Sequence, residues 1–303
     1  MWKKMLTYEG AIYRPPSEAK SLIIQATIGC SWNKCTFCVS YKDKKFRARP
    51  LSEVKAEIRR VAEHLGPYVR RVFIADGNAL VLSTSKLLEL CKELRACFPG
   101  LERISCYACP QDALRKSVEE LRALREAGLS MVYLGVESGD DEVLRRVRKG
   151  VSSEEMVEAC RKIKEAGITL SVTVILGLGG VERWVEHAKA TADVLSRIDP
   201  PYIGALTLMI VPGTPLYEEW VKGFFKPLSP LESLKELRLM VEGLNLSHCI
   251  FRCNHASNYL PIGGTLPEDK AELLDYLDYV INKLEKNPKL ASQVLRPEYL
   301  RAL

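Results

Sequence analysis

The sequence has 303 residues, 47% of them hydrophobic and 27% charged, which allows one large α/β domain or two ordinary ones. Its formal net charge of +6 is spread along the chain, so it permits an anionic ligand without requiring nucleic acid. No segment has the apolar core of a signal peptide or the length of a membrane helix, which predicts a cytoplasmic protein with no membrane partner.

Short β-branched runs alternate with longer segments of helical periodicity between residues 21 and 211. Near-continuous apolar strands separated by amphipathic helices are typical of parallel strands covered by helices. Strands are predicted over 21–28, 71–75, 103–107, 131–137, 169–176 and 203–211. Helices are predicted over 51–65, 83–97, 113–127, 140–147 and 181–197. Ser152 with Glu155 indicates a capping box at the start of a further helix.

These units are fewer than a closed barrel of this type requires. We therefore predict an incomplete (β/α)6 TIM-like barrel with a mainly helical C-terminal segment. The expected domains are an N-terminal extension, the partial barrel and a capping segment, over 1–20, 21–228 and 229–303. The capping segment is expected to close the lateral gap of the barrel over the substrate. Its predicted elements are a helix, a strand-like run, a polar loop and a second helix, with the three regular elements over 230–243, 246–251 and 267–286.

A loop with three cysteines follows the first predicted strand directly. Cys30, Cys35 and Cys38 have the spacing C-x4-C-x2-C, so one metal centre can take all three thiolates. A structural zinc site requires four protein ligands, and no other Cys or His lies near this loop in the sequence. Three ligands leave one metal position open for chemistry. The loop also follows a strand at its C-terminal end, where such barrels place their active sites.

This loop and several later strand ends resemble those of the radical S-adenosylmethionine superfamily, in particular the branch of anaerobic coproporphyrinogen oxidases and methylthiotransferases. The resemblance covers about residues 21–220. It implies that the three cysteines hold a 4Fe-4S cluster whose fourth iron binds S-adenosylmethionine. It further implies reductive cleavage of S-adenosylmethionine to a 5′-deoxyadenosyl radical, which abstracts hydrogen from the substrate. The commonest family spacing is C-x3-C-x2-C, so this loop carries one additional residue.

The resemblance also implies contacts to S-adenosylmethionine from the first part of the chain. Phe37 matches the family position that packs near the adenine. Asp76, Gly77 and Asn78 follow the second strand, where the family binds the methionine amino group, and Asp76 would supply the carboxylate. The alternative for Asp76 is a turn aspartate ahead of a glycine, which is a common loop pattern.

Three later strand ends complete the predicted cofactor contacts. Glu137 and Ser138 resemble the family's ribose site, since a carboxylate accepts two hydrogen bonds from a vicinal diol. The alternative for this pair is the N-cap of the next helix, and the two roles are compatible. Gly177 and Gly179 follow the fifth strand, where the family brings backbone close to the adenine. Val211 begins a short sequence at the end of the sixth strand that is frequent in the same branch of the family.

The substrate side is predicted in the loop that follows the strand-like run at 246–251. His255 and Asn258 stand there among Asn254, Ser257 and Tyr259. Such polar density is costly to bury unless each group finds a partner, and a bound ligand supplies partners. His255 and Asn258 are therefore predicted to line the substrate pocket. The alternative is a structural loop held together by its own side-chain hydrogen bonds.

The remaining cysteines and histidines have less specific interpretations. An auxiliary cluster is one interpretation of four cysteines, and buried thiols are the other. These cysteines are Cys106, Cys109, Cys249 and Cys253. His64 and His187 lie on predicted helices and are interpreted as surface or packing residues.

Three function classes are carried forward. We favour a radical S-adenosylmethionine enzyme acting on a small molecule or peptide, with an electron donor such as ferredoxin or flavodoxin. An RNA-modifying enzyme of the same superfamily is the first alternative, and nucleic acid is not favoured because the C-terminal segment lacks a basic–aromatic stripe. The second alternative is a non-catalytic zinc or iron–sulfur scaffold, which would not need Asp76 or Glu137.

Overall fold

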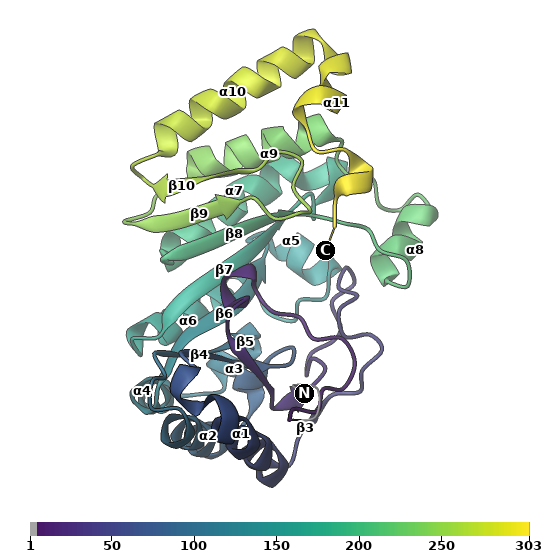
Figure 1. Ribbon diagram of the computed structural model, residues 1–303. Helices are drawn as coiled ribbons and strands as arrows, with labels where there is room; N and C mark the ends of the chain where they lie inside the picture. The colour runs from purple at the N-terminus through teal and green to yellow at the C-terminus, as the bar shows by residue number, and fades with distance from the viewer. Residues whose placement is uncertain (1–4, 303) are drawn as a thin grey trace. The chain divides into compact units, whose positions relative to one another are not determined.

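The computed structural model describes residues 5–302, and these form two compact units (Figure 1). Among these residues, the first unit comprises 5–34, 38–134 and 158–170, and the second comprises 35–37, 135–157 and 171–302. Three elements run from one unit into the other. They are β6 (Leu129–Glu137), α6 (Ser153–Glu165) and β7 (Thr169–Leu176). Within residues 5–302, no helix is both long and apolar enough to cross a membrane.

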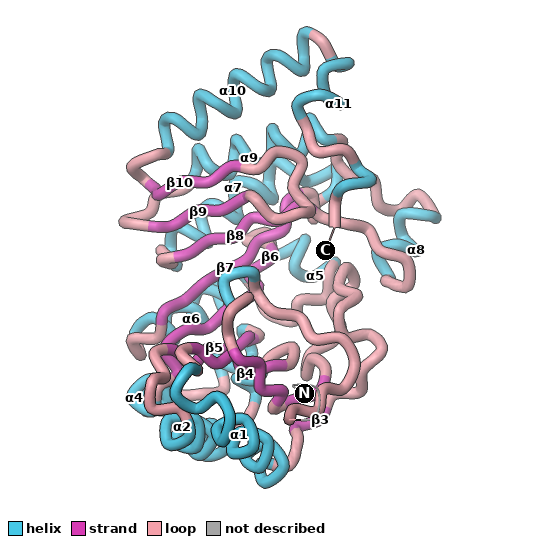
Figure 2. Tube along the Cα trace, in the orientation of Figure 1, coloured by secondary structure: helices cyan, strands magenta, loops and turns pink. Residues whose placement is uncertain are grey.

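The first unit is built on parallel strands in the order β1-β4-β5-β6, of which Figure 2 labels β4, β5 and β6. The strands new to this unit are β1 (Leu22–Gln25), β4 (Arg71–Ala75) and β5 (Arg103–Ala108). A short antiparallel pair flanks the cysteine loop, with β2 (Thr27–Ile28) before it and β3 (Arg47–Ala48) after it. Three helices pack in sequence, each against the next. They are α1 (Leu51–Leu65), α2 (Thr84–Cys97) and α4 (Val118–Ala127), and α3 (Pro110–Leu114) precedes α4.

The second unit continues with β6-β7-β8-β9-β10. β8 is parallel to β7, β9 is parallel to β8, and β10 is antiparallel to β9. These strands are β8 (Tyr202–Thr207), β9 (Cys249–Cys253) and β10 (Ile262–Leu266). α9 packs against both α7 and α10, as Figure 1 shows. The helices are α5 (Asp141–Arg146), α7 (Gly180–Ile198), α8 (Pro215–Val221), α9 (Pro230–Gly243), α10 (Lys270–Lys286) and α11 (Ala291–Val294).

The predicted incomplete TIM-like barrel of the α/β class is confirmed, with differences in detail. The elements at 51–65, 71–75, 169–176 and 230–243 have the predicted bounds. The helix predicted over 113–127 is two helices, because Ser117 forms a capping box with Glu120 that starts α4. The strand predicted over 203–211 ends at Thr207. The C-terminal segment adds β9 and β10 to the sheet, so it is less purely helical than predicted.

Aromatic side chains fill one face of the first unit's strands. Phe73, Tyr107 and Tyr133 meet edge to face, with ring centroids 5.1–6.2 Å apart. The N-terminal extension covers this cluster through Glu18, which is fully buried. Glu18 accepts a hydrogen bond from the Tyr133 hydroxyl at 2.6 Å and pairs with Arg103 at 3.0 Å. This packing holds β4 and β6 in place, and the C-terminal ends of these two strands lead to Asp76 and Glu137.

Candidate cofactor site

The start of the cysteine loop is held by the residues that follow β4. Asp76 Oδ2 accepts a hydrogen bond from the backbone N–H of Gly29 at 3.0 Å. The N–H of Gly77 donates to the Gly29 carbonyl at 3.2 Å, and Asn78 Oδ1 accepts from the N–H of Ser31 at 2.8 Å. The backbone on both sides of Cys30 is therefore fixed by three consecutive residues at one strand end.

Gly77 is required at this strand end for steric reasons. A Cβ at position 77 would lie 2.8 Å from the Cβ of Cys30 and 3.0 Å from the Tyr41 ring. Carbon atoms do not approach that closely without a shift of the backbone. The motif Asp76-Gly77-Asn78 thus places a glycine, which has no side chain, directly against Cys30, the first predicted cluster ligand.

Asp76 itself lies in the interior of the first unit. Its carboxylate is fully buried, and Oδ2 lies 2.8 Å from Lys44 Nζ and 3.2 Å from Gln25 Nε2. Oδ1 accepts no hydrogen bond of ordinary geometry from the described residues. Burial and then the charge of Asp76 raise the pKa of Tyr41, which lies nearby. The contact of Asp76 with a methionine amino group remains a prediction, while its contacts with the cysteine loop are present in the structure.

The stretch between the first and second cysteines contains a residue with left-handed backbone, Asn33. Its φ of 42° lies in the left-handed region, which asparagine tolerates better than most residues. Asn33 Nδ2 donates to the Tyr41 carbonyl at 2.7 Å, and Lys42 Nζ donates to the Asn33 carbonyl at 2.8 Å. These hydrogen bonds tie Asn33 to the segment that follows Cys38.

The end of the loop, 35–37, belongs to the second unit and is held differently. The N–H of Thr36 donates to the Val147 carbonyl and the Thr36 carbonyl accepts from the N–H of Leu216, both at 3.0 Å. Phe37 packs against an apolar cluster whose buried members are Val143, Val147 and Leu178. Phe37, predicted to pack near the adenine, is thus fixed against α5 and the segment after β7.

The exposure of the three cysteines fits a ligand role. Cys30, Cys35 and Cys38 are partly exposed, whereas five of the other seven cysteines are buried. Among residues 5–302, no three His, Cys, Asp or Glu side chains gather as a metal-ion site. Cys30 and Cys38 belong to the first unit and Cys35 to the second. Binding of one cluster by all three thiols therefore remains a prediction from their spacing and chemistry.

Glu137 has a left-handed backbone, with a φ of 66° at the end of β6. Its Oε1 lies 2.9 Å from Lys149 Nζ, and both side chains are largely buried. A Cβ on Gly135 would collide with the Glu137 carboxylate, so the side chain folds back over its own strand. Ser138 is fully buried and accepts a hydrogen bond from the N–H of Asp140 at 3.0 Å. Asp140, rather than Glu137 or Ser138, is the N-cap of α5.

A cavity of about 350 Å³ lies in the second unit beside Gly177. Gly177 has a φ of 82°, and its N–H donates to Glu236 Oε2 at 2.5 Å. Gly179 lies against α7, where a Cβ would approach the Cβ of His187 to 3.1 Å. Val211 is not among the lining residues; its carbonyl accepts from Thr214 in a turn. The lining residues are Leu176, Gly177, Thr207, Leu208, Met209, Ile210, Trp220, Pro227, Leu228, Ser233, Tyr259, Glu298 and Arg301.

His255 and Asn258 do not line this cavity. Asn258 is buried, and both polar atoms of its side-chain amide bind β8. Its Oδ1 accepts a hydrogen bond from Thr207 Oγ1 and its Nδ2 donates to the Ala205 carbonyl, both at 2.9 Å. His255 is half-buried and contacts Ser257 through Nδ1. Burial, followed by the positive charge of Arg296, lowers the pKa of His255. A direct contact of either side chain with substrate remains a prediction.

Two arginines near the C-terminus, which the sequence did not single out, hold this loop. Arg296 Nη1 lies within 3.0 Å of the carbonyls of His255, Ala256 and Asn258. Arg301 donates to the Leu208 carbonyl at 2.8 Å and lies 4.1 Å above the Tyr259 ring. Neither arginine stands in a recognisable motif, so sequence reasoning had no signal for these long-range contacts.

The cysteines considered for an auxiliary cluster lie mostly in apolar surroundings. Cys106, Cys249 and Cys253 are buried on strands. Burial raises the pKa of Cys106, and it raises the pKa of Cys249 and of Cys253 to about 12. Thiols with such values are protonated at neutral pH, whereas cluster ligands are thiolates. These surroundings favour packing roles for the three side chains.

Comparison with known proteins identifies the family. The model of the Radical SAM superfamily matches residues 24–191, more than half of the chain. The chain therefore belongs to the radical S-adenosylmethionine superfamily, as its sequence predicted. The cofactors of this superfamily are a 4Fe-4S cluster and S-adenosylmethionine.

Individual relatives share only part of their length with this chain. It is 27% identical to 4′-phospho-dehydrooxetanocin synthase of Priestia megaterium over 66% of the chain and 28% of that protein. It is 22% identical to the heme chaperone HemW of Bacillus subtilis over 76% of the chain and 61% of that protein. It is 28% identical to tRNA-2-methylthio-N(6)-dimethylallyladenosine synthase of Bordetella avium over 59% of the chain and 40% of that protein.

Solved structures of low sequence identity share the fold. Coproporphyrinogen III oxidase HemN of Escherichia coli superimposes with a TM-score of 0.55 at 19% identity, covering 73% of this chain and 51% of that one. Methylornithine synthase PylB gives a TM-score of 0.51 at 22% identity, covering 75% of this chain and 63% of that one. Both likenesses concern the partial barrel architecture alone.

Proposed function

We propose that this enzyme generates a 5′-deoxyadenosyl radical and uses it to abstract hydrogen from a small-molecule or peptide substrate. The observation that carries the proposal is the three-cysteine loop whose first ligand, Cys30, is fixed by Asp76, Gly77 and Asn78. When bound, the cluster and S-adenosylmethionine supply the radical chemistry. The protein's part is to hold three thiolates, to bind the methionine and adenosine groups, and to present the substrate.

Roles within that site follow the residues that the structure fixes. Cys30, Cys35 and Cys38 are proposed to hold the cluster, with Phe37 packing beside the cofactor and Asp76 accepting the methionine amine through Oδ1. In the second unit, Glu137 and the backbone at Gly177 are proposed to contact ribose and adenine. The left-handed backbone of Glu137 and the backbone of Gly177, which Glu236 holds in place, support these roles, because a preorganised contact loses little entropy on binding.

The cavity beside Gly177 supports a small substrate. Its volume of about 350 Å³ falls within the range of small-molecule sites. Most of its wall is apolar, and Thr207, Ser233 and Tyr259 add hydroxyl groups. Asn258 is proposed to act on this side by fixing Thr207, and His255 by shaping the same loop. The proposed compartment is the cytoplasm, where thiols remain reduced and a ferredoxin or flavodoxin can donate the electron.

The first experiment tests the radical chemistry. Anaerobically reconstituted and reduced protein is incubated with S-adenosylmethionine, and 5′-deoxyadenosine is quantified. We expect about four irons and four sulfides per chain and formation of 5′-deoxyadenosine. Zinc that iron cannot replace, with no binding of S-adenosylmethionine, would instead identify the non-catalytic scaffold.

The second experiment tests Glu137. Replacing Glu137 with alanine should weaken S-adenosylmethionine binding about ten- to a hundredfold, since a charge-assisted hydrogen bond contributes about 1.5–3 kcal/mol. Calorimetry on reconstituted protein measures the affinity. The matched control is Glu142→Ala, which removes an exposed glutamate paired with Arg145 on α5. Equal affinity for Glu137→Ala and wild-type protein would remove Glu137 from the cofactor contacts.

RNA modification is the second candidate, and it rests on the similarity to tRNA-modifying relatives. The two candidates separate in one assay with cell extract divided into RNA and small-molecule fractions. The proposed function predicts that deuterium from a labelled small-molecule fraction appears in 5′-deoxyadenosine. A mass change in tRNA nucleosides, with no response to the small-molecule fraction, would favour the RNA alternative.

A further inference from the structure

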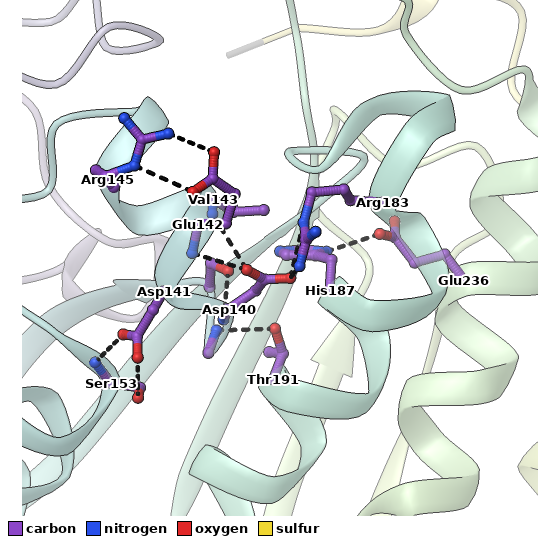
Figure 3. A network of polar contacts seen from close by, with 12 residues as sticks. Asp140, Asp141, Glu142, Val143, Arg145, Ser153, Arg183, His187, Thr191 and Glu236 are labelled. Atoms are coloured by element: carbon purple, nitrogen blue, oxygen red, sulfur yellow. Dashed lines mark hydrogen bonds and ion pairs between the residues drawn. The ribbon is translucent and has the colours of Figure 1, made fainter.

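One face of α7 carries three polar side chains at intervals of four residues, namely Arg183, His187 and Thr191 (Figure 3). Residues four apart on a helix lie above one another, so the three form a single stripe. His187 and Thr191 are almost completely buried. Buried polar groups are costly unless they find partners, so the partners of this stripe indicate its purpose.

Two members of the stripe bind the segment that follows β6. Thr191 Oγ1 accepts a hydrogen bond from the N–H of Gly139 at 2.9 Å. Arg183 Nη2 lies 2.8 Å from Asp140 Oδ2, while Asp140 Oδ1 caps α5. A Cβ on Gly139 would overlap the Ala190 carbonyl, so this backbone rests directly on the helix. Glu137 and Ser138, the proposed ribose contacts, immediately precede these two residues.

The third member acts on the segment that follows β7. His187 Nδ1 lies 2.7 Å from Glu236 Oε1, and Glu236 Oε2 accepts from the N–H of Gly177 at 2.5 Å. Glu236 is fully buried and stands on α9, so the capping segment takes part in the contact. Figure 3 shows Glu236 opposite His187 and Arg183 beside Asp140.

We infer that the stripe Arg183–His187–Thr191, with Glu236, positions the two backbone segments that contact the adenosyl group. These are positioning residues, since none of them is proposed to touch S-adenosylmethionine. One rigid helix thereby fixes the ribose segment and the adenine segment relative to each other. The inference rests on the proposed function, because it takes Glu137 and Gly177 as cofactor contacts.

The test measures S-adenosylmethionine affinity by calorimetry on the full-length reconstituted protein, with iron content and thermal unfolding recorded for each variant. Thr191→Val leaves the Gly139 N–H buried without its acceptor and should weaken binding about tenfold. Thr191→Ser keeps the hydroxyl and should restore the affinity. Iron per chain should remain at the wild-type value in both variants, since the side-chain contacts of the stripe go to Gly139, Asp140 and Glu236.

A matched arginine pair separates positioning from general stability. Arg183 and Arg197 lie on the same helix, are 39% and 32% exposed, and form ion pairs at 2.8 and 2.5 Å. Arg183→Ala should weaken binding several-fold, whereas Arg197→Ala should leave it unchanged. Wild-type affinity in both Thr191→Val and Arg183→Ala would overturn the inference, and so would equal losses in the two arginine variants.

A double variant tests whether the helix couples the two segments. If one rigid body holds both, Thr191→Val combined with Glu236→Gln should lose less affinity than the product of the single losses. Independent, multiplicative losses would show that the segments are held separately and would overturn the coupling. Wild-type protein that binds no S-adenosylmethionine would refute the proposed function instead, which distinguishes the two failures.

Discussion

The two ends of the cysteine loop are held by different kinds of contact. Around Cys30, the side chains of Asp76 and Asn78 bind loop backbone, and Asp76 is itself paired with the buried Lys44. Around Cys35, the backbone of Thr36 is bound by other backbone, and Phe37 adds apolar packing. The first end therefore depends on the identity of distant polar residues, whereas the second depends on chain path and side-chain volume.

This difference predicts how each end responds to substitution. Removing one member of a buried polar network leaves its partners unsatisfied, which is among the most destabilising changes in a protein. Removing a polar atom from the second end should have little effect, since few side-chain hydrogen bonds act there. The cysteines themselves should be equally necessary at both ends.

The largest expected effect is the loss of the cluster. Cys30→Ala, Cys35→Ala and Cys38→Ala should each abolish stable incorporation of four irons, since each is predicted to supply one thiolate. Iron and sulfide analysis with visible absorbance measures this. Cys97→Ala, which changes the partly exposed last residue of α2, is the control and should bind iron normally. A full complement of iron in Cys35→Ala would show that Cys35 is not a ligand.

The next largest effect concerns Asp76. Asp76→Ala leaves Lys44 buried without its counter-ion and should destabilise the fold by about 3–5 kcal/mol. Chemical denaturation of the apoprotein measures this free energy of unfolding. Glu9→Ala, which breaks the exposed pair with Arg47, is the control and should change stability by less than about 1 kcal/mol. An Asp76→Ala protein as stable as wild type would mean that the first end is not held by this network.

A smaller effect concerns pH and Asp112, which accepts hydrogen bonds from Asn78 and from the N–H of Cys109. Burial raises the pKa of Asp112 from 3.8 to about 6 in the folded protein. The folded state then binds a proton more readily than the unfolded state, so Asp112 favours folding below about pH 4. That contribution is lost as the pH rises through about 6.

Denaturation curves between pH 4 and 7 test this sign. Relative to Asp112→Asn, which cannot titrate, wild-type protein should lose on the order of 2–3 kcal/mol across the interval. Parallel pH profiles for the two proteins would contradict the assignment. Such a pH dependence belongs to the first end of the loop and has no counterpart in the contacts of Thr36.

The smallest effect is expected to be favourable. Thr36 is buried, and its hydroxyl finds no hydrogen-bond partner among the described residues. Thr36→Val has nearly the same shape without the unsatisfied hydroxyl, so it should stabilise the protein by about 1 kcal/mol. Thermal unfolding of the apoprotein measures the change. Clear destabilisation would show that the second end also depends on a side-chain hydrogen bond.

Local sequence patterns predicted most of the helices and strands but few of the long-range side-chain contacts. β7 was predictable because its continuous apolar run ends at Gly177. α9 was predictable because its periodic run begins directly after the capping serine, Ser229. β10 was missed because Gly263 and Gly264 occupy its centre and glycine weakens a strand pattern. The sixth strand stops four residues early, and the residues that follow it, Leu208 to Ile210, line the cavity.

The site could be predicted only as far as its motifs reach. The cysteine loop and the strand ends at Asp76, Glu137 and Gly177 carry recognisable spacing. The partners Lys44 and Glu236 do not, because they lie 32 and 59 residues away from the groups they bind. Asn258 shows the same limit, since polar density signals a need for partners without saying whether a ligand or another strand supplies them.

The buried pair of Asp76 and Lys44 has a consequence for the evolution of this loop. A chain that loses the acid at position 76 leaves the ammonium group of Lys44 buried without a counter-ion. A chain that loses Lys44 leaves the carboxylate of Asp76 buried without one. Either change alone should destabilise the fold, so the two positions should covary among descendants of this sequence, together with Gln25, whose side chain binds the same oxygen. A chimaera that takes the cysteine loop from one such descendant and β4 with residue 76 from another should therefore fold poorly. It should fold normally when residues 25, 44 and 76 all come from the same parent.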